Sequence, residues 1–239
     1  VLATEKPDIS ILTGDVVTDM PANEGWKSIG KIFEDAKTPW AVTVGNHDEE
    51  AGLTRDEVFD LIANYPYFIG EKGPELSGSG NYPLEVKASK GAKTAAVLYC
   101  IDSHNKPSAH KYGHYDWIHF DQIEWYRKTS DKYTAQNGGT PLPALAFFHI
   151  PVLEYNNVVG KEKTIGNKEE EVASPEINSG MFCSMVEKKD VMGVFVGHDH
   201  DNDYIGIDQG IALAFGRTTG VDAYGKLERG GRIIKMYEG

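Results

Sequence analysis

The chain has 239 residues, of which 40% are hydrophobic and 25% are charged, and its formal net charge is −12. This composition is typical of a folded globular protein and excludes a chain that is mainly intrinsically disordered. The acidic balance argues against a protein that coats nucleic acid. No apolar run approaches the 18 residues of a membrane-spanning helix, so we expect a soluble protein without a membrane span.

The two cysteines, Cys100 and Cys183, are too few for a disulfide framework. Both follow apolar residues, in VLYC and MFC, so we expect two buried thiols rather than a bridge. No internal repeat or linker-like stretch divides the sequence, and we therefore expect one domain over residues 1–239.

The first half of the chain alternates predicted strands with predicted helices. It opens with the end of a helix, which Lys6-Pro7 would stop. Apolar runs that end at glycine predict buried strands, and apolar residues three and four apart predict helices. The elements predicted in this way are a strand at 9–13, a helix at 24–37, a strand at 40–45, a helix at 55–63 and strands at 81–86 and 94–101.

The second half continues the alternation, which predicts an α/β fold. Its predicted elements are a helix at 120–130, a strand at 144–148, a helix at 181–188, a strand at 192–196 and antiparallel strands near 203–207, 211–215 and 232–237. The long polar segment 152–178 is either a lid over a pocket or a long surface loop.

Four of the predicted strands end in residues that bind metals. The carboxyl ends of strands in an α/β fold share one edge of the sheet, so these residues can meet in one pocket. A mixture of carboxylate, amide and imidazole ligands suits Mn, Fe, Zn or Co better than Ca. Two such ions about 3.5–4 Å apart would clamp a phosphoryl group and activate water. The candidate residues are Asp15, Asn46, His47, His149, His198 and His200.

The order of these motifs resembles the calcineurin-like metallophosphoesterase family, which includes the purple acid phosphatases. The resemblance covers residues 9–200 and implies two packed mixed β-sheets flanked by helices, in four αββα layers. The segments Tyr115-Asp116-Trp117-Ile118 and Arg217-Thr218-Thr219-Gly220 are also similar to a bacterial and fungal subgroup that resembles the purple acid phosphatases. The motifs that carry the main resemblance are Gly14-Asp15, Gly45-Asn46-His47-Asp48, His149 and Gly197-His198-Asp199-His200.

The resemblance implies a ligand set for two metal ions. Asp15 would bridge both ions, and His200 would bind the first. Asn46, His149 and His198 would complete the shell of the second ion.

The resemblance also implies a reaction, which is hydrolysis of phosphomonoesters or, second, of phosphodiesters. A hydroxide that bridges the two ions would attack phosphorus without a covalent enzyme intermediate. His47 would donate a proton to the leaving oxygen, and Asp48 would orient His47 by a carboxylate–imidazole hydrogen bond.

The sequence departs from the family pattern at two places. The family has a D-x-H strand end some tens of residues before the bridging aspartate, whereas this chain begins 14 residues before Asp15. We therefore expect the first strand to be missing, the first ion to keep only Asp15 and His200, at most one ion to bind well, and activity to be weak. Thr18 stands where purple acid phosphatases have tyrosine, so Fe(III)-phenolate chemistry is not implied.

Substrate contacts are the least determined part of the site. We expect His104, His110 and His119 to be solvated loop residues. His114 with Tyr115, and Arg217, are candidates for contacts to substrate, and Arg217 is alternatively a cap on the sheet.

Two function hypotheses remain open at this stage. The first is a metal-dependent phosphoesterase that acts on a small phosphorylated substrate or a phosphoprotein. The second is a scaffold of the same fold that has lost catalysis and binds proteins. The presence of His47, which a silent scaffold does not need, favours the enzyme. Export and the oligomeric state are left open by the sequence.

Overall fold

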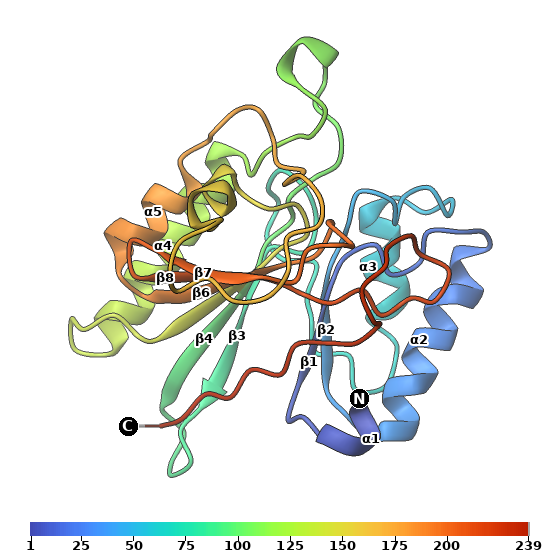
Figure 1. Cartoon of the computed structure of the whole chain (residues 1–239). Helices are drawn as coiled ribbons and strands as arrows, with labels where there is room; N and C mark the ends of the chain where they lie inside the picture. The colour runs from blue at the N-terminus through green and yellow to red at the C-terminus, as the bar shows by residue number, and fades with distance from the viewer. Residues whose placement is uncertain (239) are drawn as a thin grey trace.

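The computed structural model describes residues 1–238 and contains a six-stranded and a two-stranded β-sheet with helices on their outer faces (Figure 1). The helices are α1 (Leu2–Glu5), α2 (Ala22–Ala36), α3 (Arg55–Ile62), α4 (Phe120–Gln136) and α5 (Met181–Lys188), with 3-10 turns η1 (His110–Tyr112) and η2 (Leu153–Val158). The strands are β1 (Ser10–Thr13), β2 (Trp40–Thr43), β3 (Tyr82–Lys87), β4 (Thr94–Cys100), β5 (Ala144–Phe147), β6 (Val191–Val196), β7 (Ile205–Asp208) and β8 (Ile211–Phe215).

The large sheet has the strand order β3-β4-β5-β6-β8-β7. Its four central strands are parallel, and β3 and β7 run antiparallel to them at the two edges. In the small sheet, β1 and β2 are also parallel, in a register from Ser10 opposite Trp40 to Thr13 opposite Thr43. The carboxyl ends of β4, β5 and β6 therefore emerge at one edge of the large sheet, as those of β1 and β2 do in the small sheet.

The alternation of side chains along each strand sorts the core into two apolar clusters. Leu145 and Phe147 of β5 face the cluster shared with the small sheet, whereas Ala144 and Ala146 face the cluster covered by α4 and α5. Figure 1 shows α2 and α3 beside β1 and β2, and α4 and α5 on the opposite side of the large sheet. The layers are thus helix, sheet, sheet and helix, which confirms the predicted α/β architecture.

One tyrosine joins the two sheets by hydrogen bonds. The hydroxyl of Tyr82, on β3, donates to the carbonyl of Val42 at 2.7 Å and accepts from the backbone N–H of Val42 at 3.1 Å. Both residues are fully buried. Because a buried backbone group without a partner is costly, this pair fixes β2 against the large sheet.

Three predictions about local structure were wrong in part. Helix α4 continues to Gln136 instead of ending at Ser130. Residues 232–237 form no strand, because no neighbouring strand pairs with them within the described residues 1–238. Cys183 is exposed, since it lies on the outer face of α5 while Met181, Phe182 and Met185 face the core. Cys100 is buried, as predicted, and both thiols are free.

None of the helices within residues 1–238 has the length and apolar character needed to cross a lipid bilayer.

Candidate metal centre

The loops that follow β1, β2, β5 and β6 bring four potential metal ligands together where the two sheets meet. The Nε2 atom of His149 lies 3.1 Å from Oδ2 of Asp15, 3.0 Å from Oδ1 of Asn46 and 3.2 Å from Nδ1 of His198. His149 is only 1% exposed, and Asn46 is 5% exposed. Sequence-distant residues from both sheets therefore converge on one point.

The chemistry of these four atoms suits a cation. Nδ1 of His149 lies 2.7 Å from the carbonyl oxygen of Thr13, which can only accept, so Nδ1 carries the proton. In the neutral imidazole, the lone pair on Nε2 then faces a carboxylate oxygen and an amide oxygen. Three electron-pair donors that point at one another need a proton or a metal ion between them. Nε2 of His198 is a buried atom without a hydrogen-bond partner.

The pKa values of these residues are shifted by burial and by the charges of their neighbours in the group. Burial alone would raise the pKa of Asp15, but the hydrogen bond and the charge of His149 lower it far below its ordinary value. Burial would lower the pKa of His149, but Asp15 raises it above its ordinary value. Burial, together with the charge of His149, lowers the pKa of His198 to about 3. Each of these two shifts, in Asp15 and in His149, is thus caused by the charge and the hydrogen bond of the other residue.

Close approach of the backbone makes this arrangement possible. A Cβ atom at Gly45 would lie 2.2 Å from the backbone nitrogen of Asp15, and one at Gly14, whose φ is +86°, would lie 2.5 Å from Nδ1 of His149. Asp15 and His198 themselves have φ values of +51° and +73°. Left-handed conformations of non-glycine residues are strained and concentrate at functional sites.

Asp48 does not contact the imidazole of His47, contrary to the prediction. Its fully buried carboxylate accepts backbone hydrogen bonds from Val16 at 2.7 Å, Val17 at 2.9 Å and Gly45 at 2.7 Å. Burial raises the pKa of Asp48, and the backbone bonds from Val17 and Gly45 oppose the shift. Asp48 therefore holds the loops of Asp15 and Asn46 together, which is a structural role that the motif did not reveal.

Glu50 makes the contact to His47 that was expected of Asp48. Oε2 of Glu50 lies 2.8 Å from Nδ1 of His47, and both side chains are about half exposed. The backbone N–H of His47 donates to Oδ1 of Asp15 at 2.8 Å. A carboxylate three residues after His47 was the available signal, and it was overlooked in the sequence.

Arg55 also supports the site and was missed in the sequence. Its guanidinium donates to the carbonyl of Gly45 at 3.0 Å, to Oδ1 of Asp102 at 2.8 Å and to Oε2 of Glu49 at 3.0 Å. Arg55 is 8% exposed and Asp102 is fully buried. This ion pair connects the loop after β2 with the loop after β4.

His200 lies beside the four-residue group and is held by the C-terminal segment. Its Nδ1 donates to the carbonyl of Tyr224 at 3.1 Å, and its ring stacks on that of Tyr224 with 3.9 Å between centroids. Nε2 of His200 is therefore free to bind a ligand. Between the two histidines, Asp199 accepts a hydrogen bond from Asn202 at 2.8 Å, and burial raises its pKa to about 7.

A cavity of about 210 Å³ opens in front of these residues. No lysine or arginine is among the residues that line it. The positive charge needed to bind a phosphate group in this cavity would therefore have to come from bound cations. Ala173 brings the segment 152–178 to the rim of the cavity. The lining residues are Asp15, His47, Tyr115, Ala173, His198, His200 and Tyr224.

Two of the predicted substrate contacts lie away from this cavity. His114 is 88% exposed and pairs with Glu176 at 2.8 Å. Arg217 forms an ion pair with Asp203 and donates to the carbonyl of Glu228, so it joins the C-terminal segment to the core. Only Tyr115 of the three candidates lines the cavity.

His104 and His119 were expected to be solvated loop residues, but they contact each other and neighbouring side chains. Their rings stack with 4.3 Å between centroids, and His104 Nε2 lies 2.7 Å from Oε1 of Gln122. Together with Asp116 they form a second group of metal-binding residue types. His119 Nε2 is 3.2 Å from both Asp116 oxygens. Hydrogen bonds therefore already engage these atoms.

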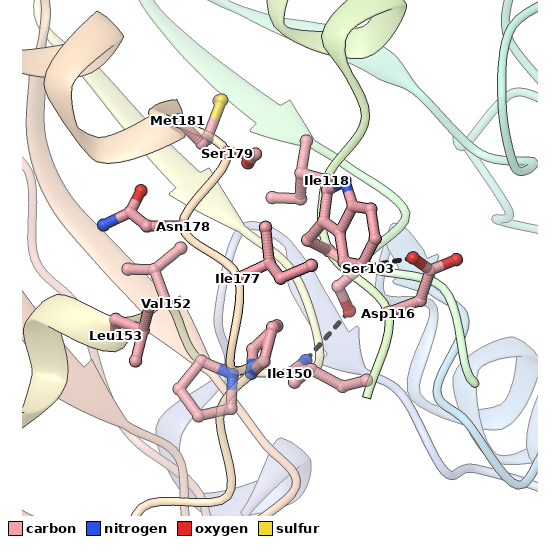
Figure 2. A pocket seen from close by; sticks show the side chains of 13 residues that line it. Ser103, Asp116, Ile118, Ile150, Val152, Leu153, Ile177, Asn178, Ser179 and Met181 are labelled. Atoms are coloured by element: carbon pink, nitrogen blue, oxygen red, sulfur yellow. Dashed lines mark hydrogen bonds between the residues drawn. The ribbon is translucent and has the colours of Figure 1, made fainter. Parts of the chain in front are cut away.

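A neighbouring pocket shares the loops of the site and is mostly apolar (Figure 2). In it, Oγ of Ser103 accepts a hydrogen bond from the backbone of Ile150 at 2.9 Å, and Asp116 accepts one from the backbone of Trp117 at 3.0 Å. Its volume of about 20 Å³ offers room for little more than one water molecule.

Comparisons with known proteins agree with this geometry. A family model described as calcineurin-like phosphoesterase matches residues 1–202. "Probable inactive purple acid phosphatase 29" of Arabidopsis thaliana is 34% identical, over 98% of this chain and 65% of that protein. "Phosphatase DCR2" of Saccharomyces cerevisiae is 32% identical, over 85% of this chain and 38% of that protein. The chain thus spans less than two thirds of each of these relatives.

Among solved structures, a dimetal phosphatase from Danio rerio has a TM-score of 0.62 with 11% identity. The match covers 90% of this chain and 74% of that one. At this identity the likeness concerns the fold.

Proposed function

The chain belongs to the calcineurin-like phosphoesterase family, and from this membership we propose that it is a metal-dependent phosphoesterase that hydrolyses phosphomonoesters. The observation that carries the proposal is the convergence of Asp15, Asn46 and His198 on Nε2 of His149, within 3.0 to 3.2 Å. The proton on Nδ1 of His149 leaves these atoms as electron-pair donors, which a divalent ion would satisfy.

Two ion positions follow from the donors. Asp15, Asn46, His149 and His198 would hold one ion, for which Mn, Fe or Zn suits the mixed oxygen and nitrogen donors. Asp15 and His200 would contribute to a second ion, and because the first ion has four such ligands we expect it to bind more tightly. When bound, such ions supply positive charge to the phosphoryl oxygens and lower the pKa of water.

His47 is the proposed general acid. Its side chain lines the cavity, and its backbone N–H is fixed by Asp15. Glu50 engages Nδ1 of His47, which leaves Nε2 available to donate a proton to the leaving oxygen. Since no lysine or arginine lines the cavity, His47 is positioned to neutralise charge on the leaving group.

A catalytically silent scaffold is the competing function. The word "inactive" in the names of three Arabidopsis relatives favours this alternative, whereas the name of the yeast relative favours a phosphatase. The two functions differ in whether the metal-loaded chain has turnover, and only the enzyme needs the imidazole of His47 for it.

Hydrolysis of para-nitrophenyl phosphate with added Mn²⁺ or Zn²⁺ tests the proposal. We expect metal-dependent turnover that His47→Ala lowers by about 10²-fold or more, as for loss of a general acid. His114→Ala, which removes an exposed imidazole outside the cavity, is the matched control and should keep the wild-type rate. Equal rates for wild type and His47→Ala would reject the role of His47. A metal-loaded wild type without turnover would support the scaffold.

A further inference from the structure

The cavity beside the metal ligands contains two aromatic side chains, which the phosphoesterase chemistry does not use. Tyr115 and Tyr224 both line it, and each packs on one histidine of the Gly197-His198-Asp199-His200 loop. Tyr115 meets the ring of His198 edge to face, with 4.6 Å between centroids and perpendicular planes.

Tyr224 is held in place on three sides. Its ring lies nearly parallel to that of His200, at an interplanar angle of 17°. Its hydroxyl donates to Oε2 of Glu170 at 3.0 Å, and its carbonyl accepts from Nδ1 of His200 and from Arg229. Asp201 accepts a further backbone hydrogen bond from Leu227 at 3.2 Å, which ties the segment to the histidine loop.

Despite these contacts, Tyr224 is 59% exposed. One face of the ring is covered by His200, and Tyr224 is among the residues that line the cavity. A fixed aromatic surface binds a planar ring without a large loss of side-chain entropy, and the energy of offset stacking corresponds to about two- to twelvefold in affinity beyond area burial.

The other residues around the cavity provide few contacts that would bind an aliphatic leaving group. They are the metal-ligand histidines and aspartate, His47 and the methyl group of Ala173. None of them is a lysine or an arginine that could bind a second phosphate or a carboxylate. The aromatic surface is thus the one element of the cavity that distinguishes substrates by their leaving group.

We propose that Tyr224 is a specificity-determining residue that stacks on the leaving group, and that the substrates are phosphomonoesters of a planar aromatic alcohol. The inference rests on the proposed function, because the phosphoryl group must bind at the metal centre for the leaving group to reach Tyr224. Aliphatic phosphomonoesters bind the same centre without this contact.

Binding of two phosphonates to the Mn²⁺-loaded chain tests the inference without turnover. Calorimetry compares phenylphosphonate, which carries a flat ring, with methylphosphonate, which does not. We expect the wild type to bind phenylphosphonate about three- to tenfold more tightly, in line with the stacking energy above. Tyr224→Leu should lose this preference and keep the affinity for methylphosphonate. Tyr224→Phe, which loses only the bond to Glu170, should retain the preference.

Tyr237→Leu is the matched control, since Tyr237 is 84% exposed and does not line the cavity. Its preference should equal that of the wild type. The inference would be overturned if Tyr224→Leu kept the preference for phenylphosphonate, or if the wild type showed no such preference. Failure of both phosphonates to bind would also overturn it. Absence of phosphatase turnover in a chain that still shows the Tyr224-dependent preference would instead count against the proposed function alone.

Discussion

Oε2 of Glu50 lies 2.8 Å from Nδ1 of His47, across the turn that follows β2. This contact orients an imidazole whose side chain is otherwise half exposed. A carboxylate bound to one ring nitrogen fixes the ring and its tautomer, as in many metal and catalytic sites.

Replacing Glu50 by alanine should therefore slow turnover without weakening metal binding. We expect Glu50→Ala to lower kcat about tenfold, whereas Glu50→Gln, which keeps an acceptor oxygen, should retain most of the rate. Steady-state kinetics with para-nitrophenyl phosphate and Mn²⁺ calorimetry measure the two quantities. Glu171→Ala, at a 94% exposed side chain, is the control. An unchanged kcat in Glu50→Ala would show that the contact has no role.

Arg55 and Asp102 form a nearly buried ion pair, and we expect its disruption to destabilise the fold. Arg55→Met leaves the buried carboxylate of Asp102 without its cation, so the free energy of unfolding should fall by about 3–5 kcal/mol. The exposed pair of Arg127 with Glu187 provides the control, and Arg127→Met should change the free energy of unfolding far less, because solvent screens this pair. Urea unfolding measures the loss of stability in both variants. Equal losses would contradict a stabilising role of the pair of Arg55 with Asp102.

The buried carboxyl of Asp199 should make the stability of the metal-free protein depend on pH. Burial raises its pKa from 3.8 to about 7, so between these values the folded protein keeps a proton that the unfolded chain releases. The contribution of Asp199 to stability is therefore greatest below pH 4 and is lost as the pH rises to 7. Asp199→Asn cannot lose a proton, so its stability relative to wild type should increase over this range. Unfolding in EDTA at pH 4 to 8 measures the difference, and a constant difference would contradict the shift.

The two thiols should differ in reactivity. Burial raises the pKa of Cys100 to about 12, whereas Cys183 is exposed. Because the thiolate is the reactive form, Ellman's reagent should modify one thiol in the native protein and two after denaturation. Cys183→Ser should remove the native reaction. Rapid modification of both thiols in the native wild type would show that Cys100 is accessible.

The sequence predicted the elements that local patterns determine. Apolar runs ending at Gly14, Gly45 and Gly197 indicated buried strands, and the shared carboxyl edge predicted that Asp15 and His198 would meet. That these residues bind metal stays a prediction.

The details that the sequence did not reveal depend on tertiary geometry. The conformation of the turn decides which acidic residue contacts His47. In this turn Asp48 accepts hydrogen bonds from three backbone N–H groups, and Glu50 contacts the imidazole. Arg55 pairs with a residue 47 positions away, so no local pattern indicates it. Residues 232–237 have an apolar pattern typical of a strand, but a strand also needs a neighbour to bond.

We propose that Asp15, Asn46, His149 and His198 hold a metal ion, and anomalous diffraction from a crystal soaked in Zn²⁺ tests this proposal. We expect the strongest anomalous peak among these four side chains, about 2.0–2.2 Å from their ligand atoms. A structure in which Zn²⁺ binds only elsewhere, for example at His104, Asp116 and His119, or in which this centre holds no ion, would contradict it.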